Sequence, residues 1–372
     1  MESFKTLFFF AASSLLLALL PFANAQHQES PFTPGTMDID TIYLNPDSDG
    51  CPLFTTMYYP QKHGFYAPIF FLGGIYDLIS TKYYKTFLQD IAKHGYIVFG
   101  IDLYPHDENN TDAYGSEMQD DLRPPKTMVE SHINQEIENR KMIPNFLEQM
   151  KWLEHHVNNR TKSRPIWEKL TLSCQSASCS IILNMVRTYP KYAAAAVFID
   201  PVCFNSKMMK PKKVHTKTLS YVSSKSFNFP FCCVKGFGYK KVYDLMTNIK
   251  VRMSVRDFGH CGLMEMSEWS ICNRTGICQS GAESQVEEYQ QFTAGMMHAF
   301  IRWTLFSQVS MRRYVIDQSL MPLALDDLDY VLHPHANTTD DMTKKSHLNS
   351  DTSNDLIHDV DLPSYDKRFS VA

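Results

Sequence analysis

The sequence predicts an α/β fold with a mostly parallel central sheet and helices on both of its faces. Strand-like segments alternate with segments of helical periodicity from residue 52 to about residue 306. Segments such as "APIFFLGG" (67–74) are apolar almost throughout, which is typical of parallel strands buried on both faces. With 44% hydrophobic residues, the chain also has enough apolar material for a large core.

The individual elements follow from composition and spacing. We expect strands at 52–60, 67–74, 96–104, 169–174, 193–202, 217–224 and 250–260. We expect helices at 80–95, 128–157, 180–189 and 285–306, where apolar residues recur three and four positions apart. Gly95 is expected to cap the first helix, and Pro144 to mark a kink or a second start in the next. The ligand site of such a sheet lies at the carboxyl ends of its strands.

The N-terminal 25 residues have the pattern of a secretory signal peptide. Lys5 precedes an apolar run, 7–20, and Ala23-Asn24-Ala25 resembles a cleavage site. The alternative, an uncleaved membrane anchor, fits less well because the run is short for a bilayer span. We therefore expect a secreted protein without a stable membrane anchor.

The mature chain is expected to form one domain, from about 40 to 330. Residues 335–372 are polar and contain few large apolar side chains. Such a segment buries too little surface to offset the entropy of ordering, which predicts a flexible tail.

Cysteines and sequons agree with export. Nine cysteines in a secreted chain indicate disulfides, with at least one thiol left over. Cys272 and Cys278 bracket a short polar loop and are expected to pair, whereas Cys174, inside a strand, is expected to be a free buried thiol. The N-x-S/T sequons, which predict glycosylation, are at Asn109, Asn159, Asn273 and Asn337.

Three residues suited to nucleophilic catalysis fall at the ends of predicted strands, in the order Ser176, Asp200, His260. A serine hydroxyl needs a base within hydrogen-bond reach, and the base needs an acid that fixes its tautomer. The order Ser, Asp, His is the one used by α/β-hydrolases. The sequence therefore predicts a Ser-His-Asp triad on an α/β-hydrolase fold.

The segment "LTLSCQSASCS" (170–180) resembles a nucleophile elbow, the sharp strand-to-helix turn with the pattern G-x-S-x-G. Cys174 and Ser178 occupy its two glycine positions, and both are small enough for the close approach of strand and helix. The alternative is that Ser173, Ser176 and Ser178 only cap the following helix.

An oxyanion hole needs two backbone N–H groups. The first is expected from Ala177, the residue after the nucleophile. The second is expected from Gly74 or Ile75, in the loop after the strand 67–74, although two glycines there are also compatible with an ordinary tight turn.

Other residues compete for the same roles. His94 and His106 are alternatives for the base, and Asp102 is an alternative for the acid. Asp102 precedes the nucleophile, which would require another chain order, so its carboxylate more simply organises a nearby loop.

The sequence lacks the patterns of several other functional classes. It shows no metal-site spacing, phosphate loop or nucleotide fingerprint, so we expect no cofactor and no metal. Its net charge of −4 and lack of a basic block predict no nucleic-acid partner.

From about residue 50 to 306 the chain resembles the chlorophyllase family, within the broader group that includes platelet-activating-factor acetylhydrolases. "LTLSCQSAS" falls where the family has L-x-L-S-G-H-S-R-G-G, "VFIDPV" matches its V-D-P-V, and "RDFGHCGLME" resembles its D-Y-G-H-x-x-x-L-D. The resemblance implies an α/β-hydrolase with Ser176, Asp200 and His260 as nucleophile, acid and base. Gln175 and Ala177 replace the family's His and Arg, and Gly73 falls where its oxyanion loop has His, which argues against chlorophyll as the substrate.

The expected function is that of a secreted serine carboxylesterase whose partner is a hydrophobic small-molecule ester. The segment 226–244 carries Phe227, Phe229, Phe231 and Phe237, which are suited to line an acyl site or to pack in a covering loop. The alternative function is a secreted binding or extracellular-matrix protein on the same scaffold, catalytically weak or inactive, since the elbow is altered.

Overall fold

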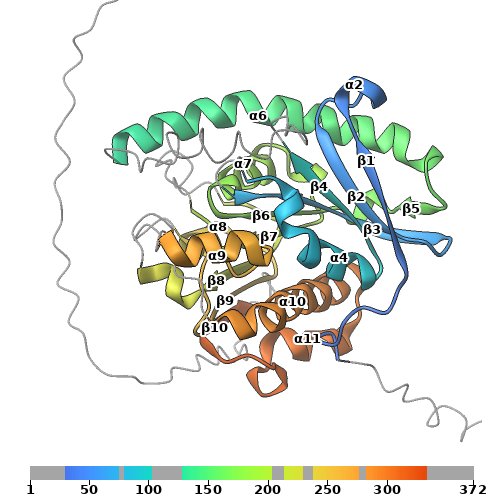
Figure 1. Cartoon of the computed structure of the whole chain (residues 1–372). Helices are drawn as coiled ribbons and strands as arrows, with labels where there is room; N and C mark the ends of the chain where they lie inside the picture. The colour runs from blue at the N-terminus through green and yellow to red at the C-terminus, as the bar shows by residue number, and fades with distance from the viewer. Residues whose placement is uncertain are drawn as a thin grey trace, which may run out of the picture. The chain divides into compact units, whose positions relative to one another are not determined.

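The computed structural model describes residues 30–74, 79–102, 128–202, 213–228, 238–275 and 282–332, with side chains described in these ranges except at 128–141, 227–228 and 271–275. All described residues belong to one compact unit, Met1–Asn337 (Figure 1). The predicted signal peptide, the tail 335–372 and residues 229–237 of the aromatic segment 226–244 lie outside the described residues.

The described part of the chain forms one sheet with the strand order β1-β2-β4-β3-β6-β7-β8-β9-β10, and β5 pairs beside β3. The strands are β1 (Ile39–Leu44), β2 (Phe54–Pro60), β3 (Gly64–Leu72), β4 (Tyr96–Asp102), β5 (Ser163–Pro165), β6 (Thr171–Gln175), β7 (Ala195–Ile199), β8 (Lys217–Ser223), β9 (Lys250–Val255) and β10 (Leu325–Val331).

The centre of the sheet is parallel and its edges are antiparallel. The strands β4, β3, β6, β7, β8 and β9 pair in parallel in that order. The strands β1 and β2 at one edge, and β10 at the other, run antiparallel to their neighbours. The predicted α/β fold with a mostly parallel sheet is therefore confirmed, while β1, β5 and β10 were not expected from the sequence.

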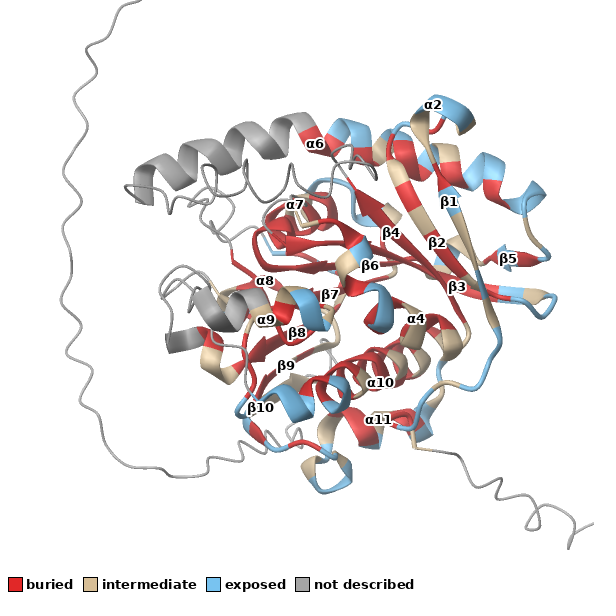
Figure 2. Cartoon of the chain, viewed as in Figure 1, coloured by how far each residue is buried: buried red, intermediate tan, exposed pale blue. Residues whose placement is uncertain are grey.

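Helices cover both faces of the sheet (Figures 1 and 2). They are α2 (Pro46–Asp49), α4 (Lys85–Lys93), α6 (Met128–His156), α7 (Cys179–Thr188), α8 (Tyr239–Leu245), α9 (Met266–Thr275), α10 (Val286–Phe306) and α11 (Val309–Ile316). Short 3-10 turns include η2 (Thr81–Tyr84), η3 (Val157–Asn159) and η5 (Ser176–Ser178). The helices α4, α10 and α11 pack into one core and α6, α7 and α8 into the other.

The two cores follow from the alternation of side chains along each strand. In β7, Val197 and Ile199 enter the core beneath α10, whereas Phe198 enters the opposite core. All five residues of this strand are buried, so an apolar side chain is required at every position. This explains why the central strands have continuous apolar sequences.

Two predicted helix features differ in detail. The helix expected at 80–95 begins as the 3-10 turn η2 and continues as α4, and Gly95 follows it with φ 92°, a conformation that favours glycine. Pro144 lies inside a single helix, α6, rather than at the start of a second one.

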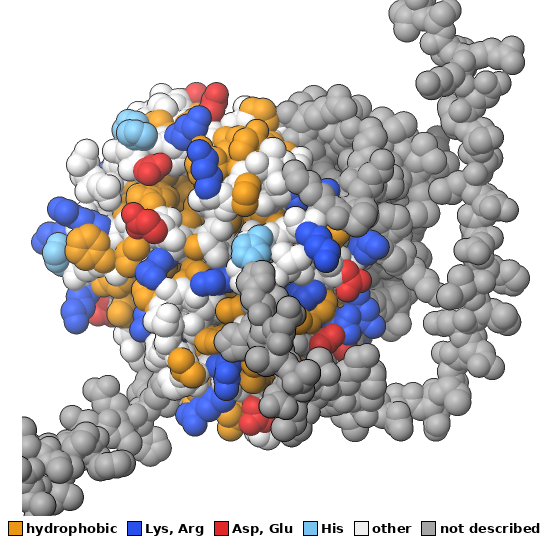
Figure 3. All heavy atoms as spheres, turned by 180° about the vertical axis from the view of Figure 1, so that it is seen from behind, with side chains coloured by type: hydrophobic (Ala, Val, Ile, Leu, Met, Phe, Trp, Pro, Cys, Tyr) orange, Lys and Arg blue, Asp and Glu red, His pale blue; other side chains and the backbone are white. Residues whose placement is uncertain are grey.

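The described helices and surface bear on membrane insertion and on charge. No helix among the described residues is both long enough and apolar enough to cross a bilayer. On the face shown in Figure 3, described Lys and Arg side chains are interspersed with acidic and hydrophobic ones, in keeping with the small net charge.

A pair of histidines packs at the amino-terminal end of β4. The rings of His94 and His298 stack with centroids 4.6 Å apart, and Tyr96 Oη lies 3.1 Å from His298 Nδ1. Burial lowers the pKa of His94 to about 4 and the pKa of His298 to about 3, the latter with further contributions from His94 and Arg302. Both rings are therefore neutral at pH 7.

Acidification is expected to destabilise the fold through this pair. Below pH 6.5 the two histidines bind protons in the unfolded chain but remain neutral in the folded one, so the free energy of unfolding falls as the pH decreases toward 4. Denaturant titrations from pH 7.5 to 5.0 should show a loss of up to about 4 kcal/mol, shared equally by the two rings.

The His94→Gln/His298→Gln double variant should have a flatter pH dependence over this range, whereas the variant of the exposed His155, His155→Gln, should match the wild type. Equal pH slopes for the double variant and the wild type would contradict the assignment.

Candidate active site

The parallel register places Ser176 and Asp200 side by side at the carboxyl edge of the sheet. Gln175, the last residue of β6, pairs with Ile199, the last residue of β7, so the next residue of each strand leaves the sheet at the same level. His260 follows β9 at the same edge, because β8 and β9 continue the parallel set. The topology thus brings the three predicted residues to one end of the sheet.

Ser176 has the backbone conformation that a nucleophile elbow requires. Its φ is 58°, whereas Gln175 before it is extended, with φ −120°. No other described residue between β6 and α7 has a positive φ. A non-glycine residue in this region costs about 1–3 kcal/mol, so surrounding contacts must maintain it. One of them is the Val202 N–H, which donates to the Ser176 carbonyl at 3.1 Å.

A disulfide spans this turn. Cys174, two residues before Ser176, is bonded to Cys179, three residues after it, with a Cα–Cα distance of 5.0 Å. The prediction that Cys174 is a free thiol was therefore wrong, because the sharp turn brings the end of the strand close to the first residue of the helix. In the chain-entropy model, closing so short a loop contributes about 2 kcal/mol, comparable to the strain at Ser176.

Asp200 is buried and its carboxylate is held by Ser223. The Ser223 N–H donates to Oδ1 at 2.6 Å, and the Ser223 hydroxyl donates to Oδ2 at 2.7 Å. The Tyr289 hydroxyl lies 2.6 Å from Ser223 Oγ and donates to it, since that hydroxyl's hydrogen is already used. Burial raises the pKa of Tyr289 well above 10, so it remains a neutral phenol at neutral pH. Asp200 itself has φ 45°, a second strained residue in the site.

The loop that carries His260 packs on Tyr289. The ring of Phe258 stacks on the Tyr289 ring with centroids 4.4 Å apart. Gly262 approaches the same ring so closely that a Cβ atom there would lie 2.8 Å from it. Tyr289 therefore supports both Asp200, through Ser223, and the loop of the candidate base.

The triad residues are close but not fully hydrogen-bonded. His260 Nδ1 lies 3.6 Å from Asp200 Oδ2, and this nitrogen has no hydrogen-bond partner among the described residues. The two side chains are 11% and 1% exposed, so the pair is largely shielded from water. No hydrogen bond joins Ser176 to His260 in the described structure, in contrast to the expected serine–imidazole contact.

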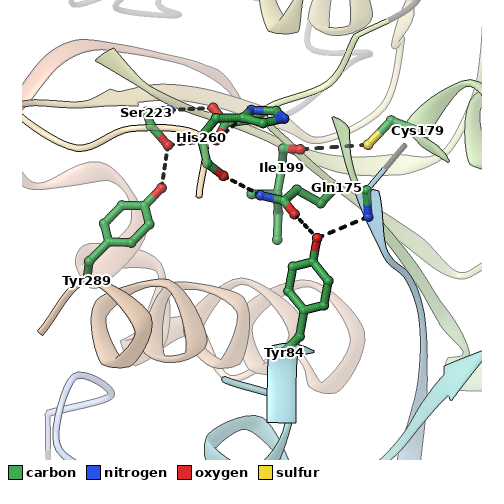
Figure 4. A network of polar contacts seen from close by, with 9 residues as sticks. Tyr84, Gln175, Cys179, Ile199, Ser223, His260 and Tyr289 are labelled. Atoms are coloured by element: carbon green, nitrogen blue, oxygen red, sulfur yellow. Dashed lines mark hydrogen bonds and ion pairs between the residues drawn. The ribbon is translucent and has the colours of Figure 1, made fainter. Parts of the chain in front are cut away.

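A chain of hydrogen bonds that the sequence did not reveal links two loops of the site through η2 and the end of β6 (Figure 4). The Gly74 N–H donates to Tyr84 Oη at 3.0 Å, and the Tyr84 hydroxyl donates to Gln175 Oε1. Gln175 Nε2 donates to the His260 carbonyl at 2.6 Å. Gln175 thus connects the loop after β3 with the loop of the candidate base. The only signal in the sequence was the glutamine beside the nucleophile.

This network changes the predicted oxyanion hole. The Gly74 N–H is engaged by Tyr84, so Gly74 is not the second donor in this arrangement. Ile75 lies outside the described residues. Ala177 lies in the first turn of the helical segment that follows Ser176, where backbone N–H groups have no intrahelical acceptor.

The alternative candidates for the acid and the base are not found beside Ser176 in the described structure. Asp102 accepts hydrogen bonds from Ser80 Oγ and the Thr81 N–H, at 2.9 and 2.7 Å, and so anchors the start of η2. His94 stacks on His298 at the opposite end of the strands. His106 lies outside the described residues.

The other predicted cysteine and glycosylation residues are placed only in part. Asn159 is exposed at the end of η3. Cys272 and Asn273 lie in α9 with undescribed side chains, and Asn109, Cys278 and Asn337 lie outside the described residues.

Cys261 is disulfide-bonded and Cys51 is a free, buried thiol. No cluster of three potential metal ligands occurs within the described ranges.

Comparison with known proteins agrees with this architecture. The family model for chlorophyllase matches residues 125–332, which include Ser176, Asp200 and His260. Chlorophyllase-1, chloroplastic, of Citrus sinensis is 21% identical over 331 residues, covering 81% of this chain and 88% of the relative. Because the family model spans more than half of the sequence, the protein belongs to the chlorophyllase family of ester-cleaving hydrolases on an α/β scaffold.

Proposed function

We propose that the protein is a secreted serine hydrolase that cleaves a hydrophobic carboxylic ester with Ser176, His260 and Asp200. The observation that carries this proposal is the strained backbone of Ser176 directly after β6, beside the Asp200–His260 pair. A serine that only capped a helix would not need a positive φ, since cap residues ordinarily adopt extended conformations.

The reaction proceeds in two halves. Ser176 Oγ attacks the ester carbonyl while His260 accepts the hydroxyl proton, and His260 then protonates the departing alcohol. Water attacks the resulting acyl-serine and loses its proton to His260. The bond from the acyl carbon to Ser176 Oγ then breaks, His260 returns the proton to Oγ, and the carboxylic acid is released. Asp200 orients the imidazole and stabilises its protonated form, for which Ser223 holds the carboxylate in place.

The Ala177 N–H supplies one donor to the oxyanion. A loop N–H after β3 supplies the other, and Ile75 is the candidate because Tyr84 engages Gly74. Catalytic hydrogen bonds are often long in the absence of substrate and shorten in the Michaelis complex. In this mechanism the 3.6 Å distance between His260 Nδ1 and Asp200 Oδ2 therefore shortens to a hydrogen bond when the substrate binds.

Export is supported by the oxidised cysteines. The Cys174–Cys179 bridge and the disulfide-bonded Cys261 are typical of an oxidising compartment. The exposed sequon at Asn159 is accessible to glycosylation. A hydrophobic ester other than chlorophyll is favoured as the substrate, because Gln175 and Ala177 replace the family's residues beside the nucleophile.

A second candidate function, binding without catalysis, is favoured by one observation. Ser176 and His260 are not hydrogen-bonded in the structure, so the serine lacks an engaged base. Reactivity toward a fluorophosphonate distinguishes the two functions, because only an activated serine reacts rapidly.

Replacing the nucleophile is expected to abolish turnover. Ser176→Ala should lower kcat for a nitrophenyl ester by at least about 10³-fold and prevent fluorophosphonate labelling, since no other group forms the acyl-enzyme.

The matched control is Ser178→Ala, which removes a buried hydroxyl two residues away for which the described residues supply no hydrogen-bond partner. Labelling and turnover should persist in this variant. Equal labelling of Ser176→Ala and the wild type would exclude Ser176 as the nucleophile, and an inert wild type would favour the binding protein.

Gln175 is expected to position the base. Gln175→Glu keeps an acceptor for Tyr84 but places a carboxylate oxygen against the His260 carbonyl, so the loop should shift. We expect kcat to fall by about 10- to 100-fold with KM nearly unchanged, because a displacement of about 1 Å at a catalytic group has effects of this size.

The matched control is Tyr84→Phe, which leaves the Gln175–His260 bond intact but frees the Gly74 N–H. Its pH–rate profile should retain the wild-type shape, whereas that of Gln175→Glu should be displaced. If kcat is unchanged in Gln175→Glu, Gln175 does not position His260.

A further inference from the structure

The disulfide at the elbow connects the central sheet to the helix that follows the candidate nucleophile. Cys174 lies within β6, where it pairs with Leu72 of β3 on one side and Phe198 of β7 on the other. Cys179 is the first residue of α7. The bridge therefore anchors the start of α7 to a strand that is fixed on both sides.

The bond encloses a small ring with Ser176 inside it. Only Gln175, Ser176, Ala177 and Ser178 lie between the two cysteines. None of them is glycine, so the turn lacks the residue that adopts a positive φ at little cost. A covalent closure restricts the alternative conformations to which a strained serine would otherwise relax.

We propose that the Cys174–Cys179 disulfide is a positioning device for the nucleophile, which holds Ser176 in its positive-φ conformation and makes full activity dependent on oxidation of this pair. This inference rests on the proposed serine-hydrolase function. It concerns how the elbow is maintained, and neither sulfur takes part in ester cleavage.

Formation of the bridge is a two-electron oxidation. The Cys174 and Cys179 thiols lose two protons and two electrons to a disulfide oxidant of the glutathione or protein-disulfide class, which leaves as two thiols. Both cysteines are fully buried in the folded protein. A reductant therefore reaches the bond only when the elbow opens, so a bridge formed during folding persists in the native enzyme.

The test compares variants that break the same bond. Cys174→Ala, Cys179→Ala and the double variant should each lower kcat and the rate of fluorophosphonate labelling by about 10- to 100-fold, with KM nearly unchanged. The effects should not add, because any one substitution removes the whole bridge, whereas independent packing losses would add. Cys51→Ala, which removes the free buried thiol, is the matched control and should keep wild-type kcat.

A second double variant, Cys174→Ala/Cys179→Val, restores part of the buried volume and guards against loss of the fold. Far-ultraviolet circular dichroism and thermal unfolding identify the folded fraction of each variant. If a double variant folds and is labelled at the wild-type rate, the disulfide does not position Ser176, while the proposed hydrolase function stands. An unreactive wild type would overturn the proposed function and, with it, this inference.

Discussion

The parallel pairing of β6 with β7 is the constraint on which the candidate site depends. Because Gln175 pairs with Ile199, Ser176 and Asp200 emerge from the sheet at adjacent positions. Each of these two residues has a positive φ, which turns the chain sharply away from the strand. Their side chains are thereby held at the carboxyl edge by the backbone itself, and His260 approaches from the loop after β9.

Strain at these two residues is offset by contacts concentrated around them. The Val202 N–H holds the Ser176 carbonyl, and the Cys174–Cys179 bridge closes the turn. Ser223 donates two hydrogen bonds to the Asp200 carboxylate, and its hydroxyl is supported by Tyr289. A buried carboxylate needs such donors, because an unpaired charge in the protein interior is costly. The same contacts that permit the strain also fix the acid.

Gln175 shows how a change beside the nucleophile alters the whole site. Its amide offers both an acceptor and a donor, and it uses them to join Tyr84 to the His260 loop. Through Tyr84 it also fixes the Gly74 N–H. The loop after β3 and the loop of the base are therefore coupled by one side chain, whereas the pattern of the family has a histidine at this position.

Local sequence was sufficient to predict the α/β fold, because continuous apolar segments such as 67–74 can only be buried on both faces. It also identified Ser176, Asp200 and His260 as candidates, since each directly follows or lies near the end of a predicted strand. The edge strands β1 and β10 were missed because partly exposed strands need no continuous apolar sequence. The Cys174–Cys179 bridge, the engagement of Gly74 by Tyr84 and the 3.6 Å gap between His260 and Asp200 depend on tertiary structure. The Gly74 contact and the gap are set by distances between segments that are separated in the sequence. The bridge depends on how close the predicted turn brings Cys174 to Cys179, and the local pattern does not give that distance.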